Sequence, residues 1–164
     1  MKKITLDAYW GKMGEYAVYN LFEKYALREP EPFIDTYVFT YEPDLLLRNY
    51  NVRLHIKSQS FDSRMRWGCY GVFGYNKEKG KGHDHEIFER ALESDYISLV
   101  NVDDKGLAVI ECIVKVRDCL RLDLFSAPAK KSLEHSKKVL RIEEVISAGL
   151  PFIDERIAEI LENK

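Results

Sequence analysis

Residues 51–60, NVRLHIKSQS, carry the pattern that most constrains how this chain folds. Polar and apolar side chains alternate along the segment, as they do in a β-strand that buries one face. The apolar side chains are Val52, Leu54 and Ile56, and the polar ones are Arg53, His55 and Lys57. A second apolar run, DLLLRN at 44–49, comes just before, and the short RNYN connection predicts that the two runs form a β-hairpin.

The predicted hairpin brings an acidic residue, Asp44, beside the polar face of the strand. If the loop centres between residues 49 and 50, Asp44 lies opposite His55; if it centres between 50 and 51, Asp44 lies opposite Lys57. Cross-strand partners share a face, so either register places the carboxylate with these two side chains. A carboxylate binds Mg²⁺ or Mn²⁺, and an ammonium group stabilises a developing oxyanion or orients an attacking water. These are the parts needed for metal-assisted cleavage of a phosphodiester.

Helical and strand-like patterns follow one another along the chain. Apolar residues recur at helical spacing from Thr5 or Asp7 to about Leu27, where REPEP at 28–32 ends the helix. The apolar stripe consists of Trp10, Met13, Ala17, Leu21 and Tyr25, widened by Val18 and Phe22. Strands are expected at 33–40, 44–49 and 51–59, around 69–75, and in a hairpin joining 95–102 to 107–116 across a DDKG turn.

Shorter elements complete the expected architecture. They are an exposed loop at 77–82, a helix at 84–93, a strand at 137–142, and helices at about 128–136, 142–148 and 152–163. The order of elements predicts the mixed α/β class, with a largely antiparallel central sheet flanked by helices.

Composition narrows the class of protein further. With 46% hydrophobic and 32% charged residues, the 164-residue chain is expected to fold as one soluble domain. No apolar run is long enough to cross a bilayer, and the start, MKKITLDAYW, lacks the apolar centre of a signal peptide. Three cysteines without CxxC spacing indicate a reduced, cytoplasmic setting. Without a P-loop or a GxGxxG motif, no nucleotide cofactor is expected, and no membrane partner either.

Charge is distributed unevenly along the chain. The net charge is −2, but residues 48–81 contain eight basic residues against two acidic ones, a net charge of +6. A local positive field on an otherwise acidic body suits an anionic partner, because only the contacting surface has to attract phosphates. A solvated basic loop without function is the alternative interpretation.

The order of these motifs resembles that of the PD-(D/E)XK nuclease superfamily. The matching elements are Gly14-Glu15 on the N-terminal helix, Pro43-Asp44, and His55-Ile56-Lys57 in the apolar strand. The resemblance extends over about residues 10–115 and is greatest to a subgroup of group I intron homing endonucleases with a non-acidic residue in the xxK motif. It implies a single domain, 1–164, with a restriction endonuclease-like core at about 5–116 and a helical extension at about 117–164.

The resemblance also implies a role for each residue. Asp44 would be the principal ligand of Mg²⁺ or Mn²⁺, Glu15 would supply a second carboxylate, and Lys57 would be the catalytic lysine. His55 stands where most members have Asp or Glu, and it would complete the metal site. A neutral imidazole ligates Mn²⁺ and other transition metals better than Mg²⁺. His55 could instead act as a general base, or mark a site that binds without cutting.

A basic and aromatic stretch follows the strand, SRMRWGCYGVFGYNKEKGKG at 63–82. Basic side chains hold phosphates and aromatic rings stack on bases. The expected nucleic-acid contacts are Gln59, Arg64, Arg66, Trp67, Lys77, Lys79 and Lys81. The alternative is that the aromatic side chains belong to an ordinary buried strand. His83 and His85 in GHDHE resemble metal ligands, but Asp84 as a helix N-cap is the simpler interpretation.

These features predict a divalent-metal-dependent DNA endonuclease, prokaryotic or phage-encoded, that acts as a homodimer. One alternative is a catalytically inactive nuclease-fold module that binds DNA or a protein partner. Another is a role in RNA processing or in resolving branched DNA.

Overall fold

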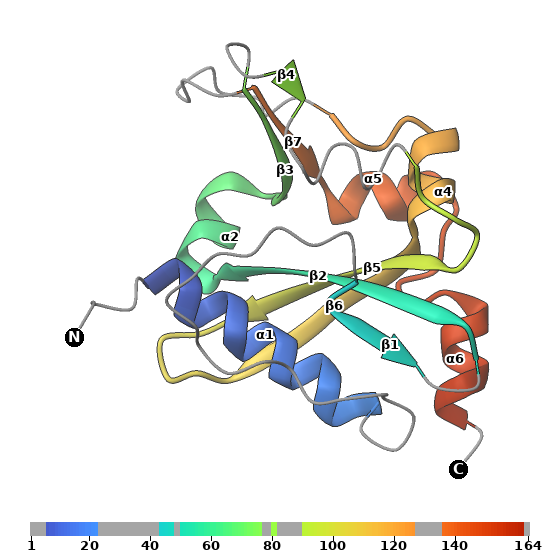
Figure 1. Ribbon diagram of the computed structural model, residues 1–164. Coiled ribbons are helices and arrows are strands. Elements are labelled where there is room, and N and C mark those ends of the chain that lie inside the picture. Colours follow the sequence, from blue (N-terminus) through green and yellow to red (C-terminus); the bar gives the residue numbers. More distant parts are fainter. Residues whose placement is uncertain are drawn as a thin grey trace.

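A four-stranded sheet with the strand order β1-β2-β5-β6 forms the centre of the molecule (Figure 1). The computed structural model describes residues 6–22, 43–47, 50–76, 80–81, 90–126 and 136–162. The strands of the sheet are β1 (Leu45–Leu47), β2 (Val52–Ser60), β5 (Asp95–Val102) and β6 (Ala108–Lys115). β1 pairs antiparallel with β2, and β5 with β6, whereas β2 and β5 run parallel. The predicted mixed, largely antiparallel sheet is confirmed.

The first hairpin adopts one of its two expected registers. Leu45 pairs with Leu54, so the next residue outward, Asp44, lies opposite His55. The turn ends at Asn51, whose φ of 50° lies in the left-handed region that asparagine tolerates. The second predicted hairpin, β5–β6, is confirmed as well.

Two helices, α1 (Leu6–Phe22) and α6 (Glu155–Glu162), lie on one face of the sheet (Figure 1). Val18 and Phe22 of α1 belong to the same buried apolar cluster as Leu54 and Ile56 of β2 and Ile160 of α6. The even-numbered side chains of β2 therefore face α1. Its odd-numbered, polar side chains leave the strand on the opposite face.

A smaller three-stranded sheet lies over that opposite face, with the order β4-β3-β7. Its strands are β3 (Tyr70–Asn76), β4 (Gly80–Lys81) and β7 (Ser136–Leu140), and the accompanying helices are α4 (Val116–Arg121) and α5 (Ile142–Ser147). Ile97 and Leu99 of β5 share an apolar cluster with Tyr70, Leu140 and Val145 of this layer. A short helix, α2 (Phe61–Trp67), follows directly after β2.

The contact line of α1 differs from the predicted stripe. Gly14, Val18 and Phe22 are buried, and they recur every four residues along one side of the helix. Leu21, expected in the core, is 45% exposed. The reason is the close approach of the helix at Gly14, which turns the 14–18–22 line toward the sheet.

Most other predicted elements are present. The strand near 69–75 is β3, the strand at 137–142 is β7, and the last two predicted helices are α5 and α6. Helices α2 and α4 were not predicted, and β4 occupies two residues of the expected loop. The strand at 33–40 lies outside the described residues. So do the end of the first helix beyond 22 and most of the helices expected at 84–93 and 128–136. Where these two are described, residues 90–93 are not helical and residue 136 begins β7, so the expected helices do not extend that far.

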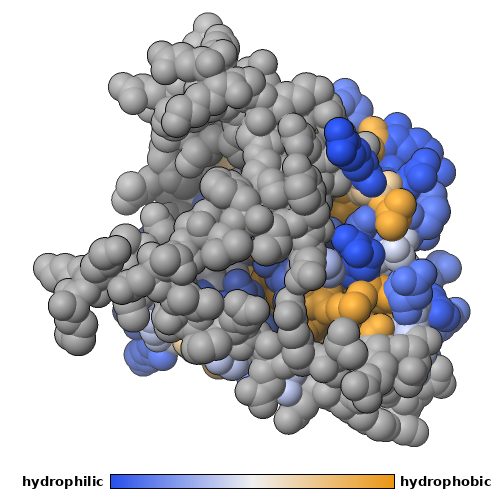
Figure 2. Space-filling view, viewed as in Figure 1, coloured by the Kyte–Doolittle hydropathy of each residue, from blue (hydrophilic) through white to orange (hydrophobic). Residues whose placement is uncertain are grey.

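Large apolar side chains reach the surface at several scattered places. Met65 is 70% exposed, Leu107 66% and Val109 55%. Figure 2 shows hydrophobic residues lying between hydrophilic ones on the right of the view. Within the described ranges, no helix is both long and apolar enough to span a bilayer.

Candidate functional site

The backbone of β2 holds the Asp44 carboxylate at the strand edge. The N–H of Ile56 donates a hydrogen bond to Asp44 Oδ2, with an N···O distance of 2.6 Å. The carboxylate therefore lies at the peptide that links His55 to Ile56. Asp44 is exposed, and Oδ1 has no hydrogen-bond partner among the described residues. This arrangement fixes the carboxylate and leaves one oxygen open to a ligand.

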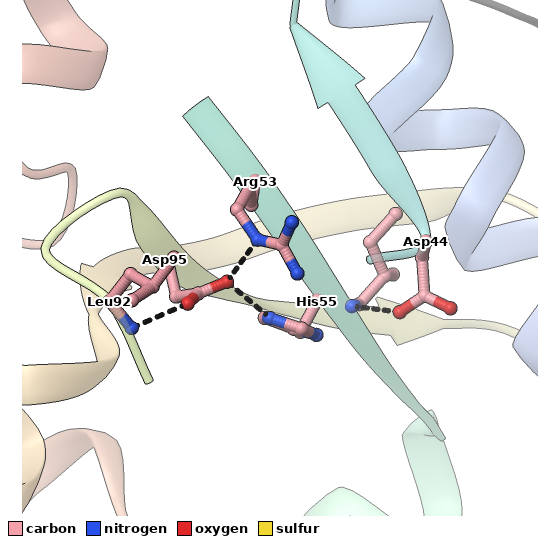
Figure 3. Close-up of polar contacts among 6 residues, drawn as sticks. Asp44, Arg53, His55, Leu92 and Asp95 are labelled. Carbon is pink, nitrogen blue, oxygen red and sulfur yellow. Dashed lines mark hydrogen bonds and ion pairs between the residues drawn. The ribbon is translucent and has the colours of Figure 1, made fainter. Parts of the chain in front are cut away.

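The imidazole of His55 contacts the strand at the other edge of β2, which is β5. His55 is 5% exposed, and its Nε2 lies 2.9 Å from Oδ1 of Asp95, the first residue of β5. Asp95 lies in register with Arg53 in the parallel pair, and Arg53 Nε donates to the same oxygen at 2.9 Å. Figure 3 shows Asp95 and Asp44 on opposite sides of β2.

Asp95 is a buried carboxylate with a full set of donors. It is 4% exposed, and its second oxygen, Oδ2, accepts from the N–H of Leu92 at 2.7 Å. Burial alone would raise the pKa of Asp95, but hydrogen bonds from His55, Leu92 and Arg53 outweigh it and lower that pKa below its usual value. Asp95 is therefore ionised at neutral pH.

Lys57 and Gln59 continue the polar row beyond His55. Alternation places both on the His55 face, where they are half-buried and lie in register with Leu99 and Asn101 of β5. The predicted row of polar side chains along one face of β2 is thus present. Its roles in catalysis and DNA binding stay predictions.

Glu15 lies apart from this row, on the helix that covers the opposite face. Its Oε2 forms an ion pair with Nζ of Lys12 one turn earlier, at 2.6 Å. Across the described ranges, no group of three or more His, Cys, Asp or Glu side chains could hold a metal ion. The set of Asp44, Glu15 and His55 thus does not form a three-ligand cluster in this part of the chain, because β2 separates the face of Glu15 from the face of His55.

Arg64, one of the expected phosphate contacts, is instead engaged within the protein. Its Nε donates to Glu111 Oε2 on β6 at 3.1 Å, and Nη2 lies 3.7 Å from Glu143 of α5. The hydroxyl of Tyr70 donates to the same Glu111 oxygen, and the guanidinium lies 5.7 Å from the centre of the Tyr70 ring. These contacts tie α2 to the second layer, so Arg64 has a structural role.

The remaining expected DNA contacts have no described side chains. Lys77 and Lys79 lie outside the described residues, Lys81 is described only as part of β4, and Arg66 and Trp67 only as part of α2. Their predicted contacts with nucleic acid remain predictions.

Asp95 is the residue of this site that sequence reasoning missed. The segment DYISLVNV has the pattern of a strand, but its local sequence does not identify the partner of its acidic first residue. The one available signal was an acidic residue at the start of an apolar strand, which is an unfavourable place for an unpaired carboxylate.

No protein-family model, no curated protein and no solved structure gives a match to this chain.

Proposed function

We propose that the protein is a divalent-metal-dependent DNA endonuclease that hydrolyses phosphodiester bonds. The observation that carries the proposal is the exposed Asp44 carboxylate, which the Ile56 N–H fixes at 2.6 Å against β2, the strand that bears Lys57. A carboxylate held by backbone and a lysine on the next strand are the groups that the PD-(D/E)XK resemblance assigns to catalysis.

The residues present fit a magnesium-type ion that is held partly by its substrate. Mg²⁺ is usually bound by one or two carboxylates together with water and substrate phosphates, so a complete protein cage is not required. Asp44 would hold the ion through its open oxygen, and water and substrate phosphate would complete the coordination; Glu15, on the other face of β2, is not among the ligands. When bound, the ion would activate water and neutralise charge on the phosphate.

The protein side chains supply the remaining functions. The Lys57 ammonium would orient the attacking water and stabilise the negative charge that develops on the phosphate. Gln59, two residues further on the same face, would donate to a phosphate oxygen. The segment 48–81, with a net charge of +6, would attract DNA through those of its basic side chains that are not paired as Arg53 and Arg64 are, and cutting both strands would require a second copy of the chain.

Nicking of supercoiled plasmid in Mg²⁺ or Mn²⁺ tests the proposal. Asp44→Asn keeps the size of the side chain and removes its charge, and we expect cleavage to fall about 100-fold or more. Asp104→Asn, at the exposed turn of the β5–β6 hairpin, is the matched control and should cleave like the wild type. Lys57→Ala should be equally defective, with Lys105→Ala as its control. Equal cleavage by Asp44→Asn and Asp104→Asn would reject the proposal.

A second function, binding without cleavage, is favoured by the environment of His55. The position where most nuclease relatives carry a metal-binding acid here holds an imidazole tied to a buried aspartate at 2.9 Å. Such a module would shift DNA in a gel-shift assay at a stated salt concentration. Neither the wild type nor Lys57→Ala would cut the plasmid. Metal-dependent nicking by the wild type would exclude it.

A further inference from the structure

The outer edge of β6 is open over a short stretch next to the β5–β6 turn. Among the described strands β6 is the last in the order of the four-stranded sheet, so one of its sides meets β5 and the other faces outward. Further along, Ile113 is paired on that outer side: its N–H donates to the Phe152 carbonyl at 2.7 Å, and its carbonyl accepts from the Asp154 N–H at 2.8 Å. Residues 107–110, with the sequence LAVI, have no such outer partner in the described part of the chain.

The hydrogen bond that closes the turn shows which backbone groups face outward. The Asp103 N–H donates to the Leu107 carbonyl at 2.9 Å, so the Leu107 carbonyl faces β5. The direction of the backbone groups alternates along an antiparallel strand. Val109 therefore also faces β5, and Ala108 and Ile110 direct their N–H and C=O groups outward. The open edge can thus form a further ladder of hydrogen bonds.

The side chains at this edge are apolar, and two of them are exposed. Ala108 and Ile110 pack against the apolar cluster beneath α1, so Leu107 and Val109 lie on the other face of the sheet. Leu107 is 66% exposed and Val109 55%. Edge strands are normally protected from pairing by charged side chains, proline or a bulge. Residues 107–110 contain no charge and no proline, and the bulge in the pairing of β6 with β5 comes after Ile110.

We propose that the open edge of β6 binds the same edge of a second copy of the chain, antiparallel and about a two-fold axis at Val109, so that the two central sheets become one continuous sheet. In this register Ala108 of each copy lies opposite Ile110 of the other, and the two residues exchange N–H···O=C bonds. A register centred on Ile110 would set Ala108 against Cys112, whose backbone groups face β5. A register centred on Ala108 would set Ile110 beyond the end of the strand. The axis at Val109 therefore satisfies the most backbone groups.

Symmetry and charge favour a second copy over an unrelated strand. The axis sets Val109 against its own copy, a β-branched apolar pair at a non-hydrogen-bonded position, where side chains lie closest. Glu111, the nearest charged residue on the strand, comes opposite Leu107 and not opposite another carboxylate, and it is already paired with Arg64. The turn at one end and the segment 152–154 at the other limit the pairing to this stretch, and a two-fold contact closes as a dimer.

The short contact predicts a weak dimer. Stable protein–protein interfaces bury about 800 Å² on each partner, and a few paired residues bury less. We therefore expect a dissociation constant in the micromolar range or weaker, so that monomer and dimer coexist at the concentrations used in solution experiments.

Sedimentation velocity of the full chain, without metal or DNA, tests the dimer. We expect the average mass to rise from that of the monomer toward that of the dimer between low micromolar and near-millimolar concentration. Val109→Lys would set two ammonium groups against each other and should weaken the dimer about 10-fold or more. Leu92→Lys is the matched control, because it adds the same charge at a side chain that is 56% exposed and lies just before the other end of β5. It should dimerise like the wild type. A monomer over the whole range, or equal dimerisation of the two variants, overturns the proposal.

Disulfide cross-linking tests the register. In a non-hydrogen-bonded pair the Cα atoms are about 4.5 Å apart, which a disulfide can span. Val109→Cys should therefore form a covalent dimer when a thiol oxidant such as diamide is added, while the native cysteines are buried. Leu107→Cys is the control, since residue 107 of one copy lies opposite residue 111 of the other and the two introduced thiols would be about 14 Å apart. Cross-linking of Leu107→Cys as fast as that of Val109→Cys would refute the axis at Val109.

The proposal does not rest on nuclease activity, and the outcomes keep the two apart. A dimer that Val109→Lys weakens, in a protein that cuts no plasmid, would support the contact and reject the nuclease. A protein that nicks plasmid but stays monomeric at every concentration would reject the contact and leave the nuclease standing.

Discussion

The substitution Gly14→Ala probes the closest contact between α1 and the sheet. A Cβ at position 14 would lie 1.7 Å from Oγ of Ser58 and 2.9 Å from its Cβ, and 3.5 Å from Cβ of Val100. Carbon atoms normally approach to about 3.5–4.0 Å. The Ser58 hydroxyl can rotate away, but its Cβ is fixed by β2. The helix must therefore move out by several tenths of an ångström or more.

The expected cost is the difference between two opposing terms. Overpacking of this kind destabilises by about 1–3 kcal/mol. Alanine stabilises a helix interior by about 1 kcal/mol relative to glycine. Gly11→Ala isolates the second term, because a Cβ at Gly11 meets nothing within 4 Å on the same helix. We expect Gly11→Ala to stabilise the protein by about 1 kcal/mol, and Gly14→Ala to be less stable than Gly11→Ala by about 1–3 kcal/mol.

Urea and thermal unfolding measure the two variants under identical conditions. For a chain of this size, 1 kcal/mol corresponds to about 2–4 °C in Tm. Ser58→Gly removes the obstructing Cβ. Its effect on the unfolding free energy should therefore be more favourable in the Gly14→Ala variant than in the wild type. Equal stability of Gly11→Ala and Gly14→Ala would refute the close approach of α1 to Ser58.

Three further predictions concern buried polar groups. Ser98 is fully buried, and its Oγ has no hydrogen-bond partner within the described part of the chain; Ser98→Ala should therefore raise the unfolding free energy by about 1 kcal/mol in urea, and a loss of that size would contradict the reasoning. Because the folded-state pKa of Asp95 is lowered, its charge stabilises the protein above the unfolded pKa of about 4 and stops doing so as pH falls through the folded value; Asp95→Asn should abolish this part of the acid dependence of unfolding, and an unchanged pH profile would count against it. Burial raises the pKa of Cys112 and of Cys119 to about 12, so both thiols should resist alkylation at pH 8 until urea unfolds the chain, and rapid labelling of the folded protein would oppose this.

Local patterns were sufficient for the hairpins and for the polar face of β2. Strict alternation specifies which side chains share a face, and a short connection specifies an antiparallel neighbour. These two rules placed Asp44 beside β2 and left two registers, of which the pairing of Leu45 with Leu54 selected one. These rules did not predict the hydrogen bond that the Ile56 N–H donates to the Asp44 carboxylate.

Helix orientation was predicted less well, because periodicity defines a broad apolar side and not the line of closest contact. The sequence placed Leu21 in the core, whereas the side that meets the sheet runs through Gly14, Val18 and Phe22. The close contact with Ser58 decides this rotation, and it depends on the shape of β2 as well as on the helix. Similarly, Arg64 reads as a surface cation in the sequence and becomes internal through Glu111, a residue 47 positions away.

The sequence by itself determined the fold class, the two hairpins and the polar row on β2, because those features depend on neighbours within a few residues. Only the tertiary structure decided what His55 faces. Its partner Asp95 is 40 residues further along and arrives through a parallel pairing that no short turn can make. Parallel neighbours are joined by a long crossover connection, so the local pattern of β2 could not show that Asp95 would lie beside His55.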